Sequence, residues 1–258
     1  MNKKNLFEKI ISKKEFSDLP KEDVKLVFQK FDKPEYLDEE KLKLTRDLLR
    51  KMYTVFLSGK LLNFKSKEPF WFLSKHLSTR ERLSFYPELY KKIFQFTEGE
   101  WILFDLGSGV NGFSSFFFPK KNLKLKYLGI EAVGQLIEIQ NKFFHGNKNF
   151  EFFHESLFDL EKIKTLFKKE KGKKIVFLFK VLDSLEMLKK DYSKTFLTEI
   201  SPLADLFVVS FATRSILSKK KFFVERRWIY DFLDKNFLVL NKFELGNEEY
   251  TIFSKKDL

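Results

Sequence analysis

The chain has 258 residues, which favours one large α/β domain or a domain with an attached module, and its 43% hydrophobic content includes no apolar run long enough for a membrane span. The absence of Cys excludes disulfides, a thiolate nucleophile and cysteine-held metal centres, and the three His residues lack metal-ligand spacing, so we expect no metal. The 49 basic and 36 acidic residues give a net charge of +13, which favours a polyanionic partner, nucleic acid ahead of a membrane surface.

The composition leaves a second interpretation open. The abundance of Lys and Phe can reflect a genome whose base composition favours their codons, and such a bias needs no ligand. The sequence begins MNKKNLFEKI, where charges interrupt every short apolar stretch, so we expect no secretory segment and a cytoplasmic protein. We also expect a monomer that has no membrane contact.

Residues 1–98 are predicted to be helical. Pro20 and the acidic residues after it indicate the start of a helix that continues to Phe31. A longer helix is predicted over 38–58 and another over 79–94, because apolar residues recur there at three- and four-residue spacings. The other face of the longer helix is basic, and we expect its cations Arg46, Arg50 and Lys51 to contact RNA.

Residues 99–258 have a different pattern, in which short apolar runs alternate with helical stretches. This alternation predicts an α/β, Rossmann-like domain with a mostly parallel sheet and helices on both faces. The last two runs are close enough to form an antiparallel hairpin. The predicted strands are 101–106, 126–131, 149–153, 175–181, 204–211, 235–241 and 249–254.

A glycine turn follows the first predicted strand in WILFDLGSGVNGF. Asp105 ends the strand, and Gly107, Ser108 and Gly109 allow a ligand to approach the backbone. The third Gly of the full dinucleotide motif is missing. The second strand ends in Glu131, 22 residues after Gly109, where a carboxylate can accept both hydroxyls of a ribose. This combination is the arrangement that holds S-adenosylmethionine; the alternative is an ordinary tight turn beside a solvated Glu131.

The segment HLSTRERL precedes the sheet region. Ser78 as N-cap and Glu81 three residues later form a predicted capping box that opens the helix. A capping box does not explain Arg80 and Arg82, whose guanidinium groups suit a carboxylate or a phosphate. We assign no chemical role to His76.

The segment VVSFATRSILSKKKFF follows a buried strand, so Thr213, Arg214 and Ser215 are expected at the carboxyl edge of the sheet, where ligands of open α/β sheets bind. A mixture of basic and aromatic residues comes next and favours RNA, through phosphate contact and base stacking. The alternative is a solvated lysine turn before a core helix. The basic residues are Lys219, Lys220, Lys221, Arg226 and Arg227.

The absence of certain residue types limits the methylation reactions that the chain could catalyse. Methylation of pyrimidine C5 commonly needs a thiolate, and the chain has no Cys. Methylation of an exocyclic amine usually relies on a proline-containing loop after the fourth strand, where this chain has KVLDSLE. Guanine N7 has an exposed lone pair and needs alignment rather than a general base, which fits this sequence.

Together, HLSTRERL, DLGSGVNGF, FLFKVLDSLE, VVSFATRSILSKKK and FELGNEEYTIF resemble, in order, the 16S rRNA guanine-N7 methyltransferases that confer aminoglycoside resistance. The stretches ISKKEFSDLPKEDV and KLTRDLLRKMYTVFL resemble the helical extension of that family. The resemblance therefore covers nearly the whole chain. It implies a class I S-adenosylmethionine-dependent methyltransferase sheet, preceded by helices that dock on the small ribosomal subunit, and a target guanosine in the decoding region.

The resemblance also implies roles for individual residues. Arg82 would hold the methionine carboxylate, and Glu131 the ribose. Ser156 stands where the family usually has Asp next to the adenine, which leaves adenine contact to the backbone around Ser156 and Leu157. Ala212 stands where the family has proline. The remaining matches are the cofactor residues Asp105, Gly107, Ser108, Gly109 and Lys180, the target-base loop Thr213 to Ser215, and the phosphate-contacting turn Lys219 to Lys221.

Two alternatives remain open at this point. The first is a methyltransferase that acts on another RNA, such as tRNA. The second is a ribosome-assembly factor that has kept the fold and the basic surface without catalysis. Resistance does not follow from the resemblance, since the low Gly content and the Phe- and Lys-rich composition differ from those of typical resistance enzymes.

Overall fold

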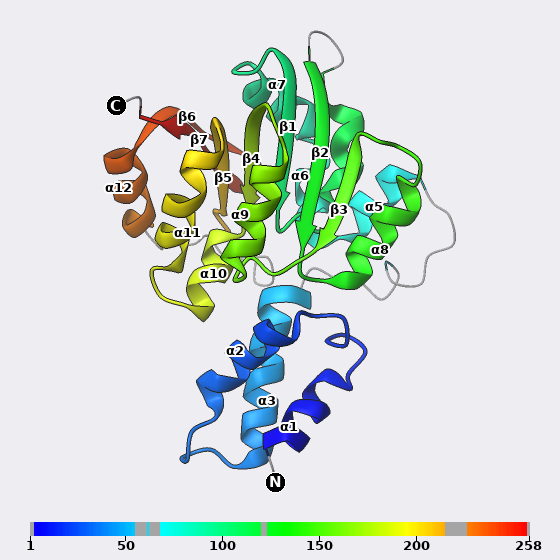
Figure 1. Cartoon of the computed structure of the whole chain (residues 1–258), viewed down its shortest axis with the longest axis vertical. Helices are drawn as coiled ribbons and strands as arrows, with labels where there is room; N and C mark the ends of the chain where they lie inside the picture. Colours follow the sequence, from blue (N-terminus) through cyan, green and yellow to red (C-terminus); the bar gives the residue numbers. More distant parts are fainter. Residues whose placement is uncertain (1–2, 55–60, 62–67, 120–122, 215–225, 257–258) are drawn as a thin grey trace.

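The computed structural model describes residues 3–54, 61, 68–119, 123–214 and 226–256 (Figure 1). Within these residues, seven strands form one sheet in the order β3-β2-β1-β4-β5-β7-β6. Neighbouring strands from β3 to β5 are parallel, whereas β7 runs antiparallel to both β5 and β6. The bounds are β1 Gly99–Leu106, β2 Leu123–Glu131, β3 Phe150–His154, β4 Lys173–Phe179, β5 Leu206–Ala212, β6 Phe237–Leu245 and β7 Glu248–Lys255.

This sheet confirms the predicted Rossmann-like α/β domain and its terminal hairpin. The order is typical of class I methyltransferases. The strand ends differ from the prediction in places: β4 ends at Phe179 because Lys180 takes a left-handed conformation with φ of 61°, which an extended strand does not accommodate. Strand β6 begins later than predicted, since the helix before it continues to Asn236.

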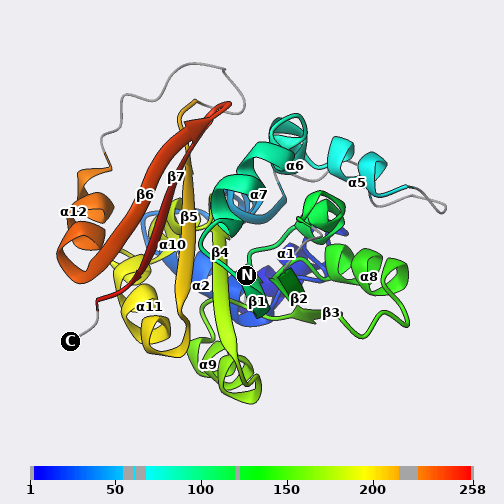
Figure 2. The ribbon, with the colours of Figure 1, turned by 90° about the horizontal axis from the view of Figure 1, so that it is seen from above.

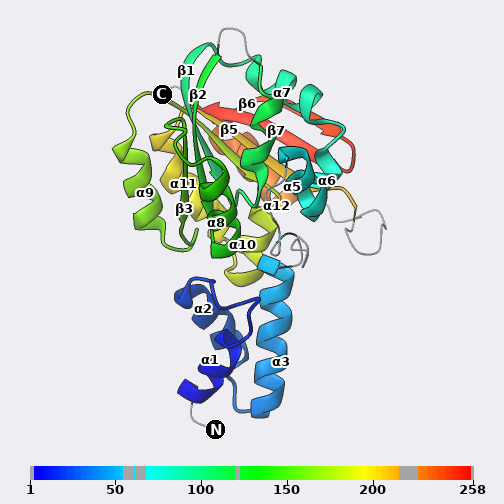
Figure 3. The same ribbon diagram turned by 90° about the vertical axis from the view of Figure 1, so that its right-hand side faces the viewer.

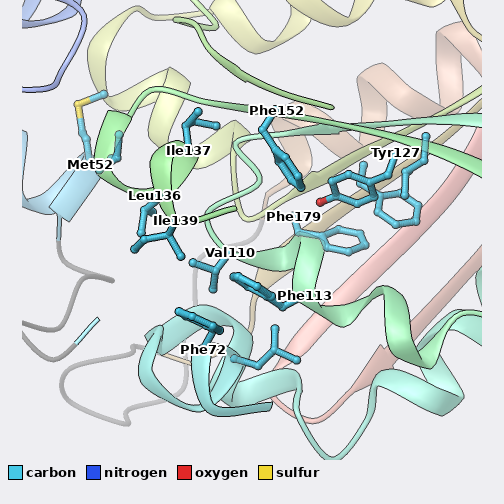
Figure 4. Packing of buried hydrophobic residues seen from close by; sticks show 14 of the residues in the cluster. Met52, Phe72, Val110, Phe113, Tyr127, Leu136, Ile137, Ile139, Phe152 and Phe179 are labelled. Atoms are coloured by element: carbon cyan, nitrogen blue, oxygen red, sulfur yellow. The ribbon is translucent and has the colours of Figure 1, made fainter. Parts of the chain in front are cut away.

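Helices cover both faces of the sheet, as Figure 2 shows from above. Side chains of β1 alternate between the two faces: Leu103 packs in one hydrophobic cluster and Phe104 in the other. The first cluster, part of which is drawn in Figure 4, includes side chains of α7 and α8. The bounds on this side are α5 Pro69–Lys75, α6 Leu77–Arg82, α7 Tyr86–Phe94, η2 Asn111–Phe117 and α8 Gly134–Phe143; on the other they are α9 Leu160–Lys169, α10 Leu182–Leu188, α11 Tyr192–Ile200, η3 Ser201–Leu203 and α12 Arg227–Asn236.

The first helices form a group of their own beyond one end of the sheet (Figures 1 and 3). This group, called the N-terminal helices below, comprises α1 Lys3–Ile11, α2 Lys21–Phe31, α3 Asp38–Leu49 and the π-helical turn η1 Arg50–Thr54. Lys30 Nζ donates to the carbonyl oxygens of Met187 (2.6 Å) and Leu188 (3.0 Å) in α10, and the backbone N–H of Gly134 donates to Asp18 O at 3.1 Å. The N-terminal helices therefore pack against segments that follow the carboxyl ends of the strands.

The structure corrects two details of the predicted helices before the sheet. Helix α6 starts at Leu77, so Ser78 lies inside it rather than at its N-cap, and the predicted capping box with Glu81 was wrong. The helix predicted over 79–94 is two helices, because Pro87 in the first turn of α7 cannot continue a helix from the preceding turn. Helices α5 to α7 pack along the sheet; the predicted domain boundary at residue 98 stays a prediction.

Candidate functional site

A pocket opens at the carboxyl ends of β1, β2 and β4, with the N-terminal helices on its far side. Its empty space is about 750 Å³, including a part that is open to solvent. It combines residues from segments far apart in the sequence. The lining residues are Asp23, Met52, Tyr53, His76, Ser78, Gly107, Gly109, Glu131, Ala132, Leu136, Leu157, Phe158, Phe179, Lys180, Val181, Ser184 and Leu185.

The two glycines of the turn after β1 cannot be replaced without strain. Gly107 and Gly109 have φ of 70° and 54°, in the left-handed region that favours glycine. A Cβ at Gly107 would lie 2.6 Å from Val181 Cγ2, and one at Gly109 would lie 2.9 Å from His76 Cε1. Both glycines line the pocket, so the turn places bare backbone against any ligand held there.

Asp105 supports this turn from behind. Its Oδ2 accepts hydrogen bonds from Asn111 Nδ2 at 2.7 Å and from the Tyr127 hydroxyl at 2.5 Å. Burial raises the pKa of Asp105, and the two hydrogen bonds oppose that effect. Asp105 and Ser108 are both predicted cofactor residues. Neither is among the described residues that line the pocket, so both lie behind its wall.

Glu131, the predicted ribose acid, lines the pocket. Its Oε2 accepts the backbone N–H of Gly109 at 2.9 Å, and its Oε1 accepts that of Val133 at 2.9 Å. Burial raises the pKa of Glu131, while these backbone hydrogen bonds favour the ionised form. An ionised carboxylate only accepts hydrogen bonds, so Glu131 can also accept from ligand hydroxyl groups that reach it in the pocket.

A buried ionic cluster lies beside the glycine turn. Arg82 pairs with both oxygens of Glu248, its Nε lying 2.9 Å from Oε2 and its Nη2 3.0 Å from Oε1. Lys180 Nζ lies 2.6 Å from Glu81 Oε2 and 3.2 Å from Glu248 Oε2. The described residues that line the pocket include Lys180 but not Arg82, so of the two predicted cofactor cations only Lys180 is placed at the pocket wall.

His76 lines the pocket between this cluster and the glycine turn. Burial, with the nearby charges of Arg82 and Lys180, lowers its pKa to about 3. The imidazole is therefore neutral at physiological pH. A neutral ring next to Gly109 is a packing partner for the turn.

Sequence reasoning missed Asp23. We interpreted this residue only as part of a helix start, but its carboxylate lines the pocket and is 1% exposed. Ser156 Oγ donates to Asp23 Oδ1, and the Tyr53 hydroxyl donates to Oδ2 at 2.8 Å. Leu157, whose backbone is expected to contact the adenine, lines the pocket. No local signal could have revealed Asp23, since its contact with Ser156 spans 133 positions.

The predicted target-base loop follows β5. Thr213 donates its backbone N–H to Asn247 O at 2.8 Å, next to the β6–β7 turn, and Arg214 is exposed. Ser215, Lys219, Lys220 and Lys221 lie outside the described residues.

The other predicted RNA-binding cations have varied surroundings. Arg226 makes a bidentate pair with Asp183, with Nη2 and Oδ2 2.8 Å apart, and only 10% of its side chain is exposed. Arg46 Nη2 donates to Lys9 O at 2.6 Å, and Arg50 Nη2 pairs with Glu15 Oε1 at 2.7 Å. These three arginines hold elements together. Lys51 and Arg227 are exposed.

Among the described residues, no group of three or more His, Asp or Glu side chains is arranged to hold a metal ion. Over the same part of the chain, no helix combines the length and the apolar character required to cross a bilayer.

Comparison with solved structures identifies the fold. The 16S rRNA methylase RmtF in complex with S-adenosyl-L-homocysteine matches with a TM-score of 0.78 and 20% sequence identity, covering 99% of this chain and 100% of that one. The 16S rRNA methylase RmtB matches with a TM-score of 0.73, 18% identity and 99% coverage of both chains. An rRNA methylase from Escherichia coli matches with a TM-score of 0.74 and 19% identity, covering 98% of this chain and 99% of that one.

The chain has the fold of the 16S rRNA methylases. The likeness extends over the N-terminal helices as well as the sheet, because nearly all of each chain is covered. No protein-family model matches the sequence, and no curated protein does. The fold is that of an S-adenosylmethionine-dependent methyltransferase, and the sequence has diverged far from its structural neighbours.

Proposed function

We propose that the protein is an S-adenosylmethionine-dependent RNA methyltransferase that transfers a methyl group to N7 of a guanosine in the decoding region of 16S rRNA. The observation that carries the proposal is the pocket: two left-handed glycines and the Glu131 carboxylate meet there, in a fold shared with 16S rRNA methylases. The basic composition and the absence of Cys support RNA as substrate and a ring nitrogen as the methyl acceptor.

The strand order sets how the cofactor would lie. Along the sheet edge the pocket passes from Lys180 after β4, through the glycine turn after β1 and Glu131 after β2, to Leu157 after β3. With the ribose on Glu131, the amino-acid end of the cofactor lies towards Lys180. Arg82 lies next to Lys180, because both cations pair with Glu248. The base then lies among apolar side chains on the β3 side.

The cofactor supplies an electrophilic methyl group on a sulfonium. The chain's own residues bind the cofactor and orient the target base towards its methyl group. Thr213, Arg214 and Ser215 follow β5, the neighbour of β4, and are proposed to hold the target base near the amino-acid end of the pocket. Guanine N7 attacks through its lone pair without prior loss of a proton, so the neutral His76 need not act as a base.

We further propose that the N-terminal helices dock on the small ribosomal subunit. Lys51 and Arg227 are exposed and suited to phosphate contact, whereas Arg46, Arg50 and Arg226 are proposed to act mainly by fixing the elements that carry such contacts. The protein is proposed to work as a cytoplasmic monomer.

Methyl transfer tests the proposal directly. Purified protein with labelled cofactor and 30S subunits should give N7-methylguanosine in 16S rRNA, located by mass spectrometry of the digested RNA. Glu131→Ala should weaken cofactor binding by at least about tenfold, because two hydrogen bonds to a charged group are lost. The matched control is Glu138→Ala, which removes an exposed carboxylate paired with Lys142 and should bind the cofactor normally.

The other outcomes distinguish the alternatives. If the label appears in tRNA and not in 30S subunits, the substrate is another RNA, as the first alternative states. No transfer to 30S subunits, naked rRNA or tRNA, with cofactor binding absent or indifferent to Glu131→Ala and Arg82→Ala, would favour a non-catalytic assembly factor.

A second test concerns the lysine run that is proposed to contact RNA phosphates. Replacing Lys219, Lys220 and Lys221 by Ala should weaken RNA binding and reduce the slope of log affinity against log salt by about one unit for each lost phosphate contact. The control is the same substitution at Lys168, Lys169 and Lys171, which are exposed near the end of α9, just before the amino end of β4. Equal salt slopes for the two triple variants would favour the alternative that Lys219, Lys220 and Lys221 form a solvated turn without RNA contact.

A further inference from the structure

The adenine end of the pocket has a carboxylate that belongs to the N-terminal helices. Asp23 lies in the first turn of α2, is almost completely buried and lines the pocket together with Met52 and Tyr53 of η1. Its partner Ser156 follows β3 and precedes Leu157, which also lines the pocket. The wall at this end is therefore built by two parts of the chain that are distant in sequence.

The position of Asp23 along the pocket identifies what it faces. The proposed function places the ribose on Glu131 at the end of β2, so the base extends towards β3. On that side the lining is apolar, with Ala132, Leu136, Leu157 and Phe158, which suits the faces of a planar ring. The Asp23 carboxylate is a polar group in this apolar part, so it would meet the edge of the ring.

The hydrogen bonds of Asp23 leave it able to accept more. The carboxylate accepts one hydroxyl at each oxygen, from Ser156 and from Tyr53. An ionised carboxyl group has about four acceptor sites and no donor, so about two sites remain. A ring nitrogen that only accepts cannot fill them, whereas an exocyclic amino group can.

We propose that Asp23 accepts a hydrogen bond from the 6-amino group of the cofactor's adenine, and that Ser156 and Tyr53 are positioning residues that hold its carboxylate. The proposal rests on the proposed function, because it takes the ribose position from Glu131. It replaces the expectation that only the backbone around Ser156 and Leu157 reads the base. Specificity for adenine then depends on a residue of the N-terminal helices.

Calorimetry with two ligands tests the role of Asp23. S-adenosylhomocysteine is compared with the analogue whose purine lacks the 6-amino group. The wild-type protein should bind the amino ligand at least about tenfold more tightly, since a hydrogen bond to a buried charged acceptor distinguishes the two. In Asp23→Ala the preference should fall to twofold or less. Ser156→Ala and Tyr53→Phe should each reduce it partly.

The matched control is Glu22→Ala, which removes the neighbouring carboxylate, a side chain that is 76% exposed and paired with Lys25. This variant should keep the wild-type preference. Because the readout is a ratio of two affinities in the same sample, a fraction of unfolded variant does not change it.

Each outcome has one meaning. Equal affinity of the wild-type protein for both ligands overturns the proposal without any variant, and so does an unchanged preference in Asp23→Ala; in both cases the proposed methyltransferase function stands. No binding of S-adenosylhomocysteine to the wild-type protein overturns the proposed function and the role of Asp23 together.

Discussion

Replacing Glu248 by Gln is expected to lower the free energy of unfolding by about 3–5 kcal/mol, the usual cost of breaking a buried ion pair. Glu248 is 2% exposed and is the shared partner of Arg82 and Lys180. Without its charge, Arg82 loses its ion pair with Glu248, and Lys180 keeps its pair with Glu81. Urea denaturation at neutral pH measures the effect.

A surface ion pair provides the comparison for Glu248. Asp234 pairs with Lys242 at 3.0 Å, and both side chains are exposed, at 54% and 38%. Solvent screens such a pair, so Asp234→Asn should cost no more than about 1 kcal/mol. If Glu248→Gln costs no more than this control, the buried cluster is not what holds β7 against α6.

The second large effect is a loss of folding stability at acidic pH. His76 should make the protein less stable as the pH falls below 6.5, because its pKa is about 3 in the folded protein and 6.5 in the unfolded chain. Between these values the unfolded chain binds a proton that the folded protein excludes. One such group lowers the free energy of unfolding by up to about 1.4 kcal/mol per pH unit, or about 2 kcal/mol between pH 7 and pH 5. Well above pH 6.5, where both states leave the ring unprotonated, the contribution is constant.

His76→Gln measures this contribution. The variant removes the titrating ring, so its free energy of unfolding should change less between pH 7 and pH 5 than that of the wild type, by about 2 kcal/mol. The same pH dependence in His76→Gln as in the wild type would show that His76 is not the buried titrating group.

The features that sequence predicted well depend on neighbours in the chain. The buried run at Trp101 to Leu106 and the glycines after it predict a strand and a turn, because alternation and left-handed backbone are local properties. Glu131 could be expected beside the glycine turn because parallel strands end at the same edge of a sheet. The strand order was implied by the family that the sequence motifs resemble.

The features that sequence did not predict depend on distant partners. Ser78 and Glu81 match a capping box, yet the helix starts earlier and both side chains contact cations, Arg82 and Lys180. Arg82 was expected at a ligand, and its guanidinium pairs with Glu248, 166 positions away.

The sequence by itself determined the alternation of strands and helices, the glycine turn, the carboxylate at the end of β2 and the absence of a thiol, because these follow from residue type and short spacing. Only the tertiary structure decided which charges neutralise one another and which element closes the pocket on the β3 side. Asp23 shows the physical reason: a carboxylate on an ordinary helix start becomes part of the pocket wall only when folding brings α2 against the segment after β3.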